Sequence, residues 1–224
     1  TKRLFKVFPD KEDVLEDDVY VMSYNVRNFD LYNWSRNNET KNQILDFLKI
    51  TDPGILCIQE FFNTTDPKHD FKTLEILENE LSATHSHIDY TNTVNGTENW
   101  GIATFSQYPI VGRHQLRFPL SPNNICIVTD VMHGIDTLRI YNVHLASIHF
   151  NSEDYTFLKA YAAEKQSKRL TGWGKIIGKL NRAYKFRATQ VNTIKEHIDN
   201  SPYPVILCGD FNDTPISYAY QQIS

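Results

Sequence analysis

Five polar side chains stand where apolar, strand-like stretches of the chain end, and together they could bind a divalent cation and act on a phosphate. Asp210 and Asn212 follow the apolar residues 205–209, and their spacing places both side chains on one side of an extended chain. Three further apolar runs end in the same way, at Asn25, Glu60 and His144. A single residue of this kind is usually a polar group that opens a loop. Four such strand ends in one chain indicate an active site.

The donor types favour a hard cation. Carboxylate and amide oxygens without cysteine suit Mg²⁺ or Mn²⁺ better than zinc, and Glu60 is the strongest candidate ligand, with Asn25 beside it. Mg²⁺ usually takes one or two carboxylates together with a phosphate oxygen, so the set predicts phosphoryl chemistry. In that chemistry His144 could donate a hydrogen bond to the phosphate or protonate the leaving group.

The composition is that of a folded domain. Of the 224 residues 41% are hydrophobic and 22% are charged, and the net charge is −4. These values exclude a disordered chain and a general binder of polyanions. The three cysteines, Cys57, Cys126 and Cys208, lie in apolar runs without a CxxC pair, so buried thiols are expected. We expect a leading segment over residues 1–18 and a single domain over residues 19–224.

Short apolar runs predict the strands that must position these side chains. Strands are expected over residues 19–24, 55–60, 101–105, 125–132, 138–143 and 205–209. The pair 125–132 and 138–143 predicts an antiparallel hairpin, and Asn95-Gly96 predicts a further tight turn.

Helical spacing of apolar residues predicts helices over residues 40–50 and 71–83. Residues 152–200 carry more helical material, which we expect to be interrupted at Gly172, Gly174 and Gly178, with the last helix beginning near Arg187. Because strands and helices do not alternate strictly, a layered α/β fold with mixed or antiparallel sheets is favoured.

Five motifs appear in a fixed order along the chain. They are Ser23-Tyr24-Asn25-Val26, Ile58-Gln59-Glu60, the stretch from Gly101 to Ile110, Asn142-Val143-His144-Leu145 and Gly209-Asp210-Phe211-Asn212. Over residues 19–217 the sequence resembles the endonuclease/exonuclease/phosphatase superfamily, which includes deoxyribonuclease I, abasic-site endonucleases, sphingomyelinases and inositol-phosphate phosphatases. The resemblance implies a four-layered α/β sandwich, two mixed β-sheets flanked by helices, that hydrolyses phosphoester bonds with Mg²⁺.

The resemblance also implies a role for each strand-end residue. Glu60 matches the metal-binding glutamate of the superfamily, and Asn25 its companion at the metal and the phosphate. His144 matches the histidine that contacts the phosphate. Asp210 and Asn212 match the pair that polarises the nucleophile side and orients the scissile group.

Two further residues, Arg187 and Gln190, have an Arg-x-x-Gln spacing similar to that of the superfamily, which implies a packing or substrate-edge role. The Asp-His pair that closes the superfamily pattern, and whose histidine is the general base, is not found before Ser224. We therefore expect a domain that is incomplete at its C-terminal end and lacks the closing strands. The start at Thr1 without methionine also suggests a membrane tether upstream of that residue.

A basic stretch bears on the substrate. Its charges are Lys165, Lys168, Arg169, Lys175, Lys179, Arg182, Lys185 and Arg187. Lys175 and Lys179 are candidates for binding the backbone of a nucleic acid or an anionic lipid surface, and the alternative is a solvated helix face. A nuclease-like phosphodiesterase is our first interpretation. A phosphoesterase for lipid headgroups or inositol phosphates is the main alternative, and a catalytically inactive binding module is another.

Overall fold

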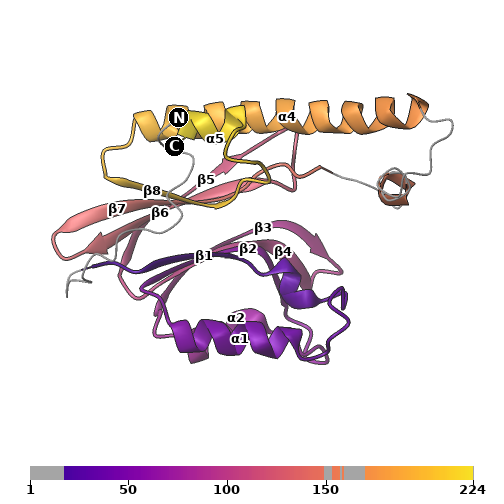
Figure 1. Cartoon of the computed structure of the whole chain (residues 1–224). Helices are drawn as coiled ribbons and strands as arrows, with labels where there is room; N and C mark the ends of the chain where they lie inside the picture. Colours follow the sequence, from indigo (N-terminus) through magenta and orange to yellow (C-terminus); the bar gives the residue numbers. More distant parts are fainter. Residues whose placement is uncertain (1–17, 149–152, 157, 159–169, 224) are drawn as a thin grey trace.

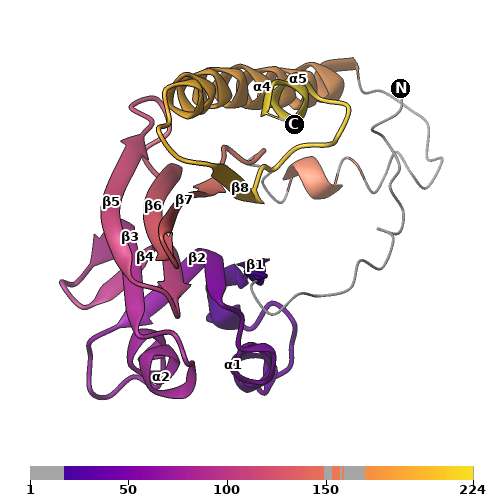
Figure 2. The ribbon, with the colours of Figure 1, turned by 90° about the vertical axis from the view of Figure 1, so that its left-hand side faces the viewer.

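Two four-stranded β-sheets pack face to face in the computed structural model, and helices cover the outer face of each sheet (Figures 1 and 2). The structure describes residues 18–148, 153–156, 158 and 170–223. The first sheet has the strand order β1-β2-β4-β3, and the second has the order β5-β6-β7-β8. This confirms the expected four-layered sandwich with two mixed sheets.

The strands of the first sheet are β1 (Val21–Asn25), β2 (Ile55–Thr64), β3 (His85–Val94) and β4 (Glu98–Ser106). Those of the second are β5 (Ile110–Arg117), β6 (Ile125–His133), β7 (Asp136–His144) and β8 (Val205–Asp210). The helices α1 (Thr40–Thr51) and α2 (Thr73–Glu80) cover the first sheet, and α4 (Leu170–Asp199) and α5 (Tyr218–Ile223) cover the second (Figure 1). A short 3-10 segment, η1 (Arg27–Asp30), follows β1.

The hydrophobic core lies on both faces of β2. Burial on both faces is what the apolar run at the start of this strand predicts. Its residues Leu56 and Ile58 pack with α1 and α2, whereas Ile55 and Cys57 pack against the second sheet at Val131 and Ile140. Alternate residues of a strand point to opposite faces, so one run of sequence supplies two core layers. Cys57 and Cys126 are buried and Cys208 is partly buried, all as free thiols.

Each sheet contains one parallel pair, and this brings the candidate site together. β1 runs parallel to β2 with Asn25 opposite Gln59, and β7 runs parallel to β8 with His144 opposite Asp210. The carboxyl ends of parallel strands meet at the same edge of a sheet. Polar residues from distant parts of the sequence therefore gather at one end of the molecule.

The prediction that Gly172, Gly174 and Gly178 interrupt the helical region was wrong. All three lie within α4, which runs without a break for 30 residues from Leu170. A glycine in a helix costs about 1 kcal/mol relative to alanine. The apolar face of α4 offsets that cost, because Val191 and Ile194 are fully buried in the core of the second sheet. The expected start of the last helix near Arg187 was therefore also too late.

Two strands were not expected, because their sequences are largely polar. β3 and β5 carry several His, Asn, Thr, Arg and Gln residues, and each is held by antiparallel pairing with a buried neighbour, β4 or β6. The predicted antiparallel hairpin of β6 and β7 is confirmed. The predicted turn at Asn95-Gly96 is also confirmed, because Asn95 and Gly96 have positive φ values of 53° and 71°.

Several sequence expectations fall on residues outside the described part of the chain. These are the leading segment up to residue 17, and Lys165, Lys168 and Arg169 of the basic stretch. Within the described residues, no helix combines the length and apolar character that crossing a membrane requires.

Candidate active site

The side chain of Asn25 joins the two sheets at the candidate site. Its Nδ2 donates a hydrogen bond of 2.9 Å to Oε1 of Glu60 and one of 2.8 Å to Oδ2 of Asp210. Asn25 and Glu60 come from the first sheet, whereas Asp210 ends the outermost strand of the second. The two carboxylates therefore converge on one amide group, which offsets part of the repulsion between them.

Glu60 does not end its strand, as the sequence had predicted, but forms a β-bulge inside β2. The pairing of β2 with β4 runs to Ile58, skips Gln59 and Glu60, and resumes at Phe61, and Glu60 has a φ of 50°. A bulge re-aims a side chain without ending the strand. Gln59 and Phe61 thus stay buried while the carboxylate of Glu60 turns toward the site.

A buried amide pair lies beneath the carboxylates. Gln59 Nε2 donates to Asn142 Oδ1 at 2.7 Å, and Asn142 Nδ2 donates to the carbonyl oxygen of Ala103 at 2.9 Å. Both amides are almost fully buried, and they tie β2 and β4 to β7 directly behind the site. Sequence analysis gave them no role, although each lies within a motif that carries a site residue.

Three side chains are grouped closely enough to surround one cation. Glu60, His144 and Asp210 each offer a ligand atom, and these atoms all lie within 4.8 Å of one another. His144 Nε2 lies 3.9 Å from Oε1 of Glu60. Two carboxylate oxygens suit Mg²⁺ or Mn²⁺. The donor set fits such an ion, with Glu60 and Asp210 as its oxygen ligands.

The amide of Asn25 contacts both candidate carboxylate ligands. Its nitrogen faces the two carboxylates, and its oxygen accepts a hydrogen bond of 2.9 Å from the backbone N–H of Arg27. The metal contact that the resemblance implies for Asn25 stays a prediction. Partners that orient metal ligands in this way commonly matter almost as much as the ligands.

His144 is largely buried at the end of β7. Burial lowers the pKa of its imidazole, and the carboxylates of Asp210 and Glu60 oppose that shift. The net direction is downward, so the neutral imidazole is the main form at neutral pH. A neutral ring can donate a hydrogen bond from one nitrogen only.

The loop after β8 fixes Asp210 from its other side. The backbone N–H of Asn212 donates to Asp210 Oδ1 at 2.8 Å, and Asn212 Nδ2 donates to the carbonyl oxygen of Leu145 at 3.0 Å. Both oxygens of Asp210 therefore accept a hydrogen bond from the protein. Asn212 orients the aspartate and holds the segment after His144 in place.

Arg187 and Gln190 lie inside the protein, 1% and 2% exposed. Arg187 donates to Asp213 Oδ2 and to the carbonyl oxygen of Ala146, both at 2.8 Å, and Gln190 Oε1 accepts from the N–H of Ala146 at 3.0 Å. These contacts support the packing role, and because Arg187 also lines a cavity together with Asp210 and Asn212, the substrate-edge role stays a prediction. Asp213, the buried partner of Arg187, was missed by sequence analysis.

The two lysines that were expected to bind substrate differ in their surroundings. Lys175 is exposed on α4, whereas Lys179 forms an ion pair with Asp154 and lines a cavity beside the site. Substrate binding by either lysine stays a prediction, and Lys179 has the support of a cavity that it lines.

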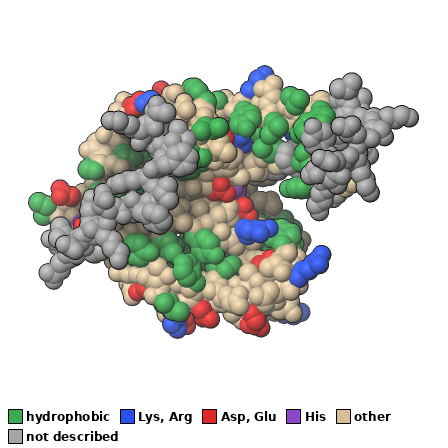
Figure 3. All heavy atoms as spheres, viewed as in Figure 1, with side chains coloured by type: hydrophobic (Ala, Val, Ile, Leu, Met, Phe, Trp, Pro, Cys, Tyr) green, Lys and Arg blue, Asp and Glu red, His purple; other side chains and the backbone are tan. Residues whose placement is uncertain are grey.

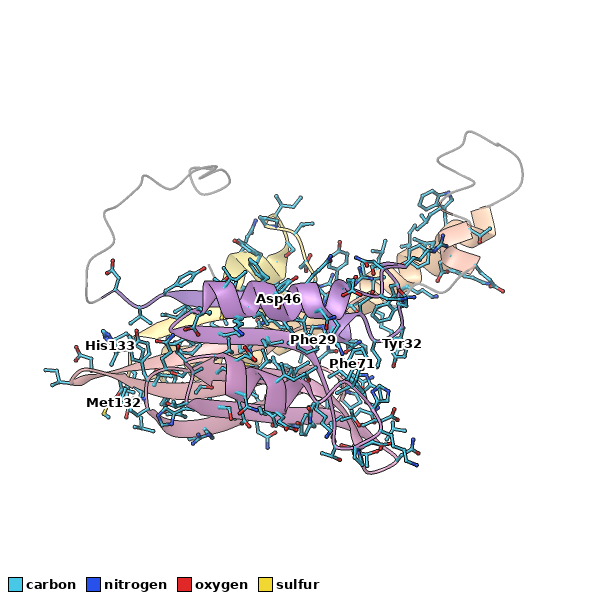
Figure 4. The ribbon with its side chains drawn as sticks, turned by 90° about the horizontal axis from the view of Figure 1, so that it is seen from below. Phe29, Tyr32, Asp46, Phe71, Met132 and His133 are labelled. Carbon is cyan, nitrogen blue, oxygen red and sulfur yellow. The ribbon has the colours of Figure 1, made fainter. Side chains whose placement is uncertain are left out.

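The η1 segment brings a further set of residues to the site. Its four residues, Arg27–Asp30, all have positive φ, between 48° and 58°. Such backbone costs roughly 1–2 kcal/mol per residue and persists only where packing enforces it. Phe29 is fully buried against Phe61 with ring centroids 5.9 Å apart, so it anchors the turn. Phe29 and Tyr32 lie at the opposite end of the molecule from the β6–β7 turn at His133 (Figure 4).

A cavity of about 440 Å³ opens beside the carboxylates, and we call it the catalytic cavity. Glu60 and His144 line it together with asparagine and aromatic side chains, among them Asn28, Asn92, Asn123, Tyr32 and Trp100. In Figure 3 the surface is hollowed between the two halves of the molecule, and acidic side chains lie at the edge of the hollow. None of the described residues that line the catalytic cavity is a lysine or an arginine.

Residues 22–224 match the model of the Endonuclease/Exonuclease/phosphatase family. The chain belongs to this family. No curated protein sequence matches the chain.

Solved structures similar to this family member share its fold at low sequence identity. A humanized D. rerio TDP2 superposes with a TM-score of 0.56 at 14% identity, covering 88% of this chain and 63% of its own. An endonuclease/exonuclease/phosphatase from Beutenbergia cavernae gives 0.57 at 15%, covering 91% and 51%. The human Nocturnin catalytic domain, which has a bound sulfate anion, gives 0.58 at 20%, covering 92% and 69%. The chain therefore spans between half and about two thirds of the length of these structures.

Proposed function

We propose that this chain is a metal-dependent phosphoester hydrolase, and that its substrate is a phosphodiester of a nucleic acid. The observation that carries the proposal is the convergence of Glu60, Asp210 and His144, with ligand atoms within 4.8 Å of one another, beside an open cavity that Glu60 and His144 line. Membership of the family supports the reaction class. Phosphoester hydrolysis requires positive charge against the phosphoryl oxygens and water as the nucleophile.

Glu60 and Asp210 would hold Mg²⁺ or Mn²⁺, and the bound ion would neutralise charge on the phosphoryl oxygen. The hydrogen bonds from Asn25 orient both carboxylates, and the hydrogen bond from Asn212 keeps Asp210 in place. Neutral His144, which lines the same cavity, would donate a hydrogen bond to a non-bridging oxygen of the phosphate. In this arrangement the protein supplies orientation, and the attacking water enters through the open side of the cavity.

The lining of the catalytic cavity favours a nucleic acid over an inositol polyphosphate. Several phosphates on one small ring require several cationic side chains. The described lining instead offers the amides of Asn28, Asn92 and Asn123 and the rings of Tyr32 and Trp100. Amides can pair with the edges of bases, and aromatic rings can stack on them.

The proposal is tested by hydrolysis of bis(p-nitrophenyl) phosphate, a single-stranded oligonucleotide and sphingomyelin, each with Mg²⁺, with Mn²⁺ and with EDTA. We expect hydrolysis of bis(p-nitrophenyl) phosphate and of the oligonucleotide but not of sphingomyelin. In EDTA we expect hydrolysis to be lost completely. Preferential hydrolysis of sphingomyelin would assign the site to lipid headgroups. Tight oligonucleotide binding without hydrolysis under every condition would instead support a binding module.

A further inference from the structure

A second cavity, of about 360 Å³, lies next to the catalytic cavity, between the loop of residues 120–124 and α4. Its α4 wall carries Lys179, Arg182 and Phe186, and its floor includes Ala146 and Ser147. We call it the Arg182 cavity. Its described lining contains two cationic side chains, whereas that of the catalytic cavity contains none.

The two cavities are neighbours along the chain as well as in space. Asn123 lines both of them. His144 lines the catalytic cavity and Ala146 lines the Arg182 cavity, and two residues of chain span at most about 7 Å. The backbone of Ala146 is held on both sides by Arg187 and Gln190. A ligand longer than one phosphate could therefore extend from one cavity into the other over a rigid floor.

Arg182 is the cation best placed to meet an anion there. Its guanidinium lies over the ring of Phe186, 5.2 Å from the ring centroid, and the stacking limits its freedom. A guanidinium presents a planar pair of donors that matches two phosphate oxygens. The charge of Lys179 is partly offset by its ion pair with Asp154.

The remaining lining is apolar enough to accept a sugar or a base. Leu120, Pro122 and Ala183 join Phe186 in the wall, and Leu120 is 70% exposed at the opening. An aromatic ring beside a guanidinium suits a nucleotide, because the base can stack while its phosphate binds the cation. A lipid with a single phosphate would place that phosphate at the metal site and leave Arg182 without an anion.

We propose that the Arg182 cavity binds the nucleotide next to the scissile phosphate of a single-stranded polynucleotide, with its phosphate on Arg182 and its base against Phe186. This rests on the proposed function, since the scissile phosphate must occupy the catalytic cavity. The cavity would then select a chain of phosphates over an isolated phosphodiester.

The test compares Arg182→Gln with Lys185→Gln, which removes the same charge from an exposed position of α4 outside the cavity. A hydrogen bond to a charged group contributes more binding free energy than one between neutral groups. For Arg182→Gln we therefore expect KM for a single-stranded dodecanucleotide to rise about 10-fold or more. Hydrolysis of bis(p-nitrophenyl) phosphate, which fills the catalytic cavity only, should change less than about 2-fold. Lys185→Gln should change neither, and equal effects of the two variants on the dodecanucleotide would overturn the proposal.

Binding measured in EDTA separates this proposal from the proposed function, because it requires no hydrolysis. By fluorescence anisotropy, Arg182→Gln should weaken dodecanucleotide binding and reduce the slope of log K against log salt by about 0.7, the value for one phosphate contact on a single strand. An unchanged slope would contradict the subsite even if the wild-type chain is an active hydrolase. Phosphatidylserine vesicles serve as a competitor of the dodecanucleotide in the same assay. If Arg182→Gln abolished this competition but left dodecanucleotide binding unchanged, the cavity would be assigned to lipid, and the proposal would be overturned.

Discussion

At the scale of single residues, Asn25 has a role that its position at a strand end does not predict. One amide nitrogen serves two carboxylates at 2.9 Å and 2.8 Å, and those carboxylates belong to different sheets. Without a cation, this shared donor is the described contact that keeps Glu60 and Asp210 close despite their like charge. A bound cation would add a second and stronger attraction between them.

Replacing Asn25 by aspartate should therefore destabilise the protein in a metal-dependent manner. The change removes the donor and places a third negative charge beside Glu60 and Asp210. In EDTA we expect the free energy of unfolding to fall by about 1–3 kcal/mol. Mg²⁺ should stabilise Asn25→Asp more than the wild-type chain, as measured by thermal melting with and without the ion. Equal melting temperatures of the two proteins in EDTA would show that Asn25 does not hold the carboxylates together.

At the scale of the elements, the close approach of β8 to β7 sets the position of Asp210. Gly209 has a φ of 137°, and a Cβ atom there would lie 2.1 Å from the carbonyl oxygen of Val143. No side chain fits between these strands at that point. The glycine therefore allows β8 to place Asp210 opposite His144.

Gly209→Ala should for this reason destabilise the fold and displace the site. We expect the free energy of unfolding, measured in urea, to fall by about 1–3 kcal/mol, because the backbone must move to relieve the contact. Gly178→Ala is the matched control, since a Cβ at this position of α4 meets no atom within 4 Å. That change should raise stability by up to about 1 kcal/mol. Similar effects of the two substitutions would contradict the close approach.

The sequence predicted elements well where one physical signal dominated. Apolar runs located the strands that carry Asn25, His144 and Asp210, and the resemblance assigned these residues together. Neither the apolar run nor the resemblance could locate the bulge at Glu60. A bulge follows from the register between β2 and β4, and the sequence only shows that Gln59 and Glu60 lie between the apolar residues Ile58 and Phe61. The polar strands β3 and β5 depend on pairing with their neighbours, which a local pattern does not record.

At the scale of the whole molecule, the candidate site lies on the seam between two sheets, and its geometry depends on how the sheets pack. Buried polar contacts fix that packing in addition to the apolar core. Gln59 bonds to Asn142 near the site, and Nδ1 of His87 on β3 lies 2.8 Å from Oγ1 of Thr129 on β6. Such pairs are invisible in the sequence because their partners are 83 and 42 residues apart.

The His87 contact predicts acid sensitivity of the sheet packing. Burial, together with the charges of Arg113 and His114, lowers the pKa of His87 to about 4 from its ordinary value of 6.5. Below pH 6.5 the unfolded chain takes up a proton that the folded protein does not, so stability falls as the pH decreases from 6.5 toward 4. His87→Gln should lose less stability than the wild-type chain over that interval in urea unfolding. A wild-type stability that is flat between pH 6.5 and 4.5 would contradict the buried neutral imidazole.

The most direct test of the account is a calorimetric titration of the protein with Mn²⁺. The two carboxylates come from different sheets, and we propose that they hold one ion between them. The wild-type chain should bind one Mn²⁺, and Glu60→Gln and Asp210→Asn should each weaken binding at least about 10-fold. Asp136→Asn, which removes an exposed carboxylate in the β6–β7 hairpin, should leave the affinity unchanged. Wild-type affinity in Glu60→Gln or Asp210→Asn would contradict a metal site shared by the two sheets.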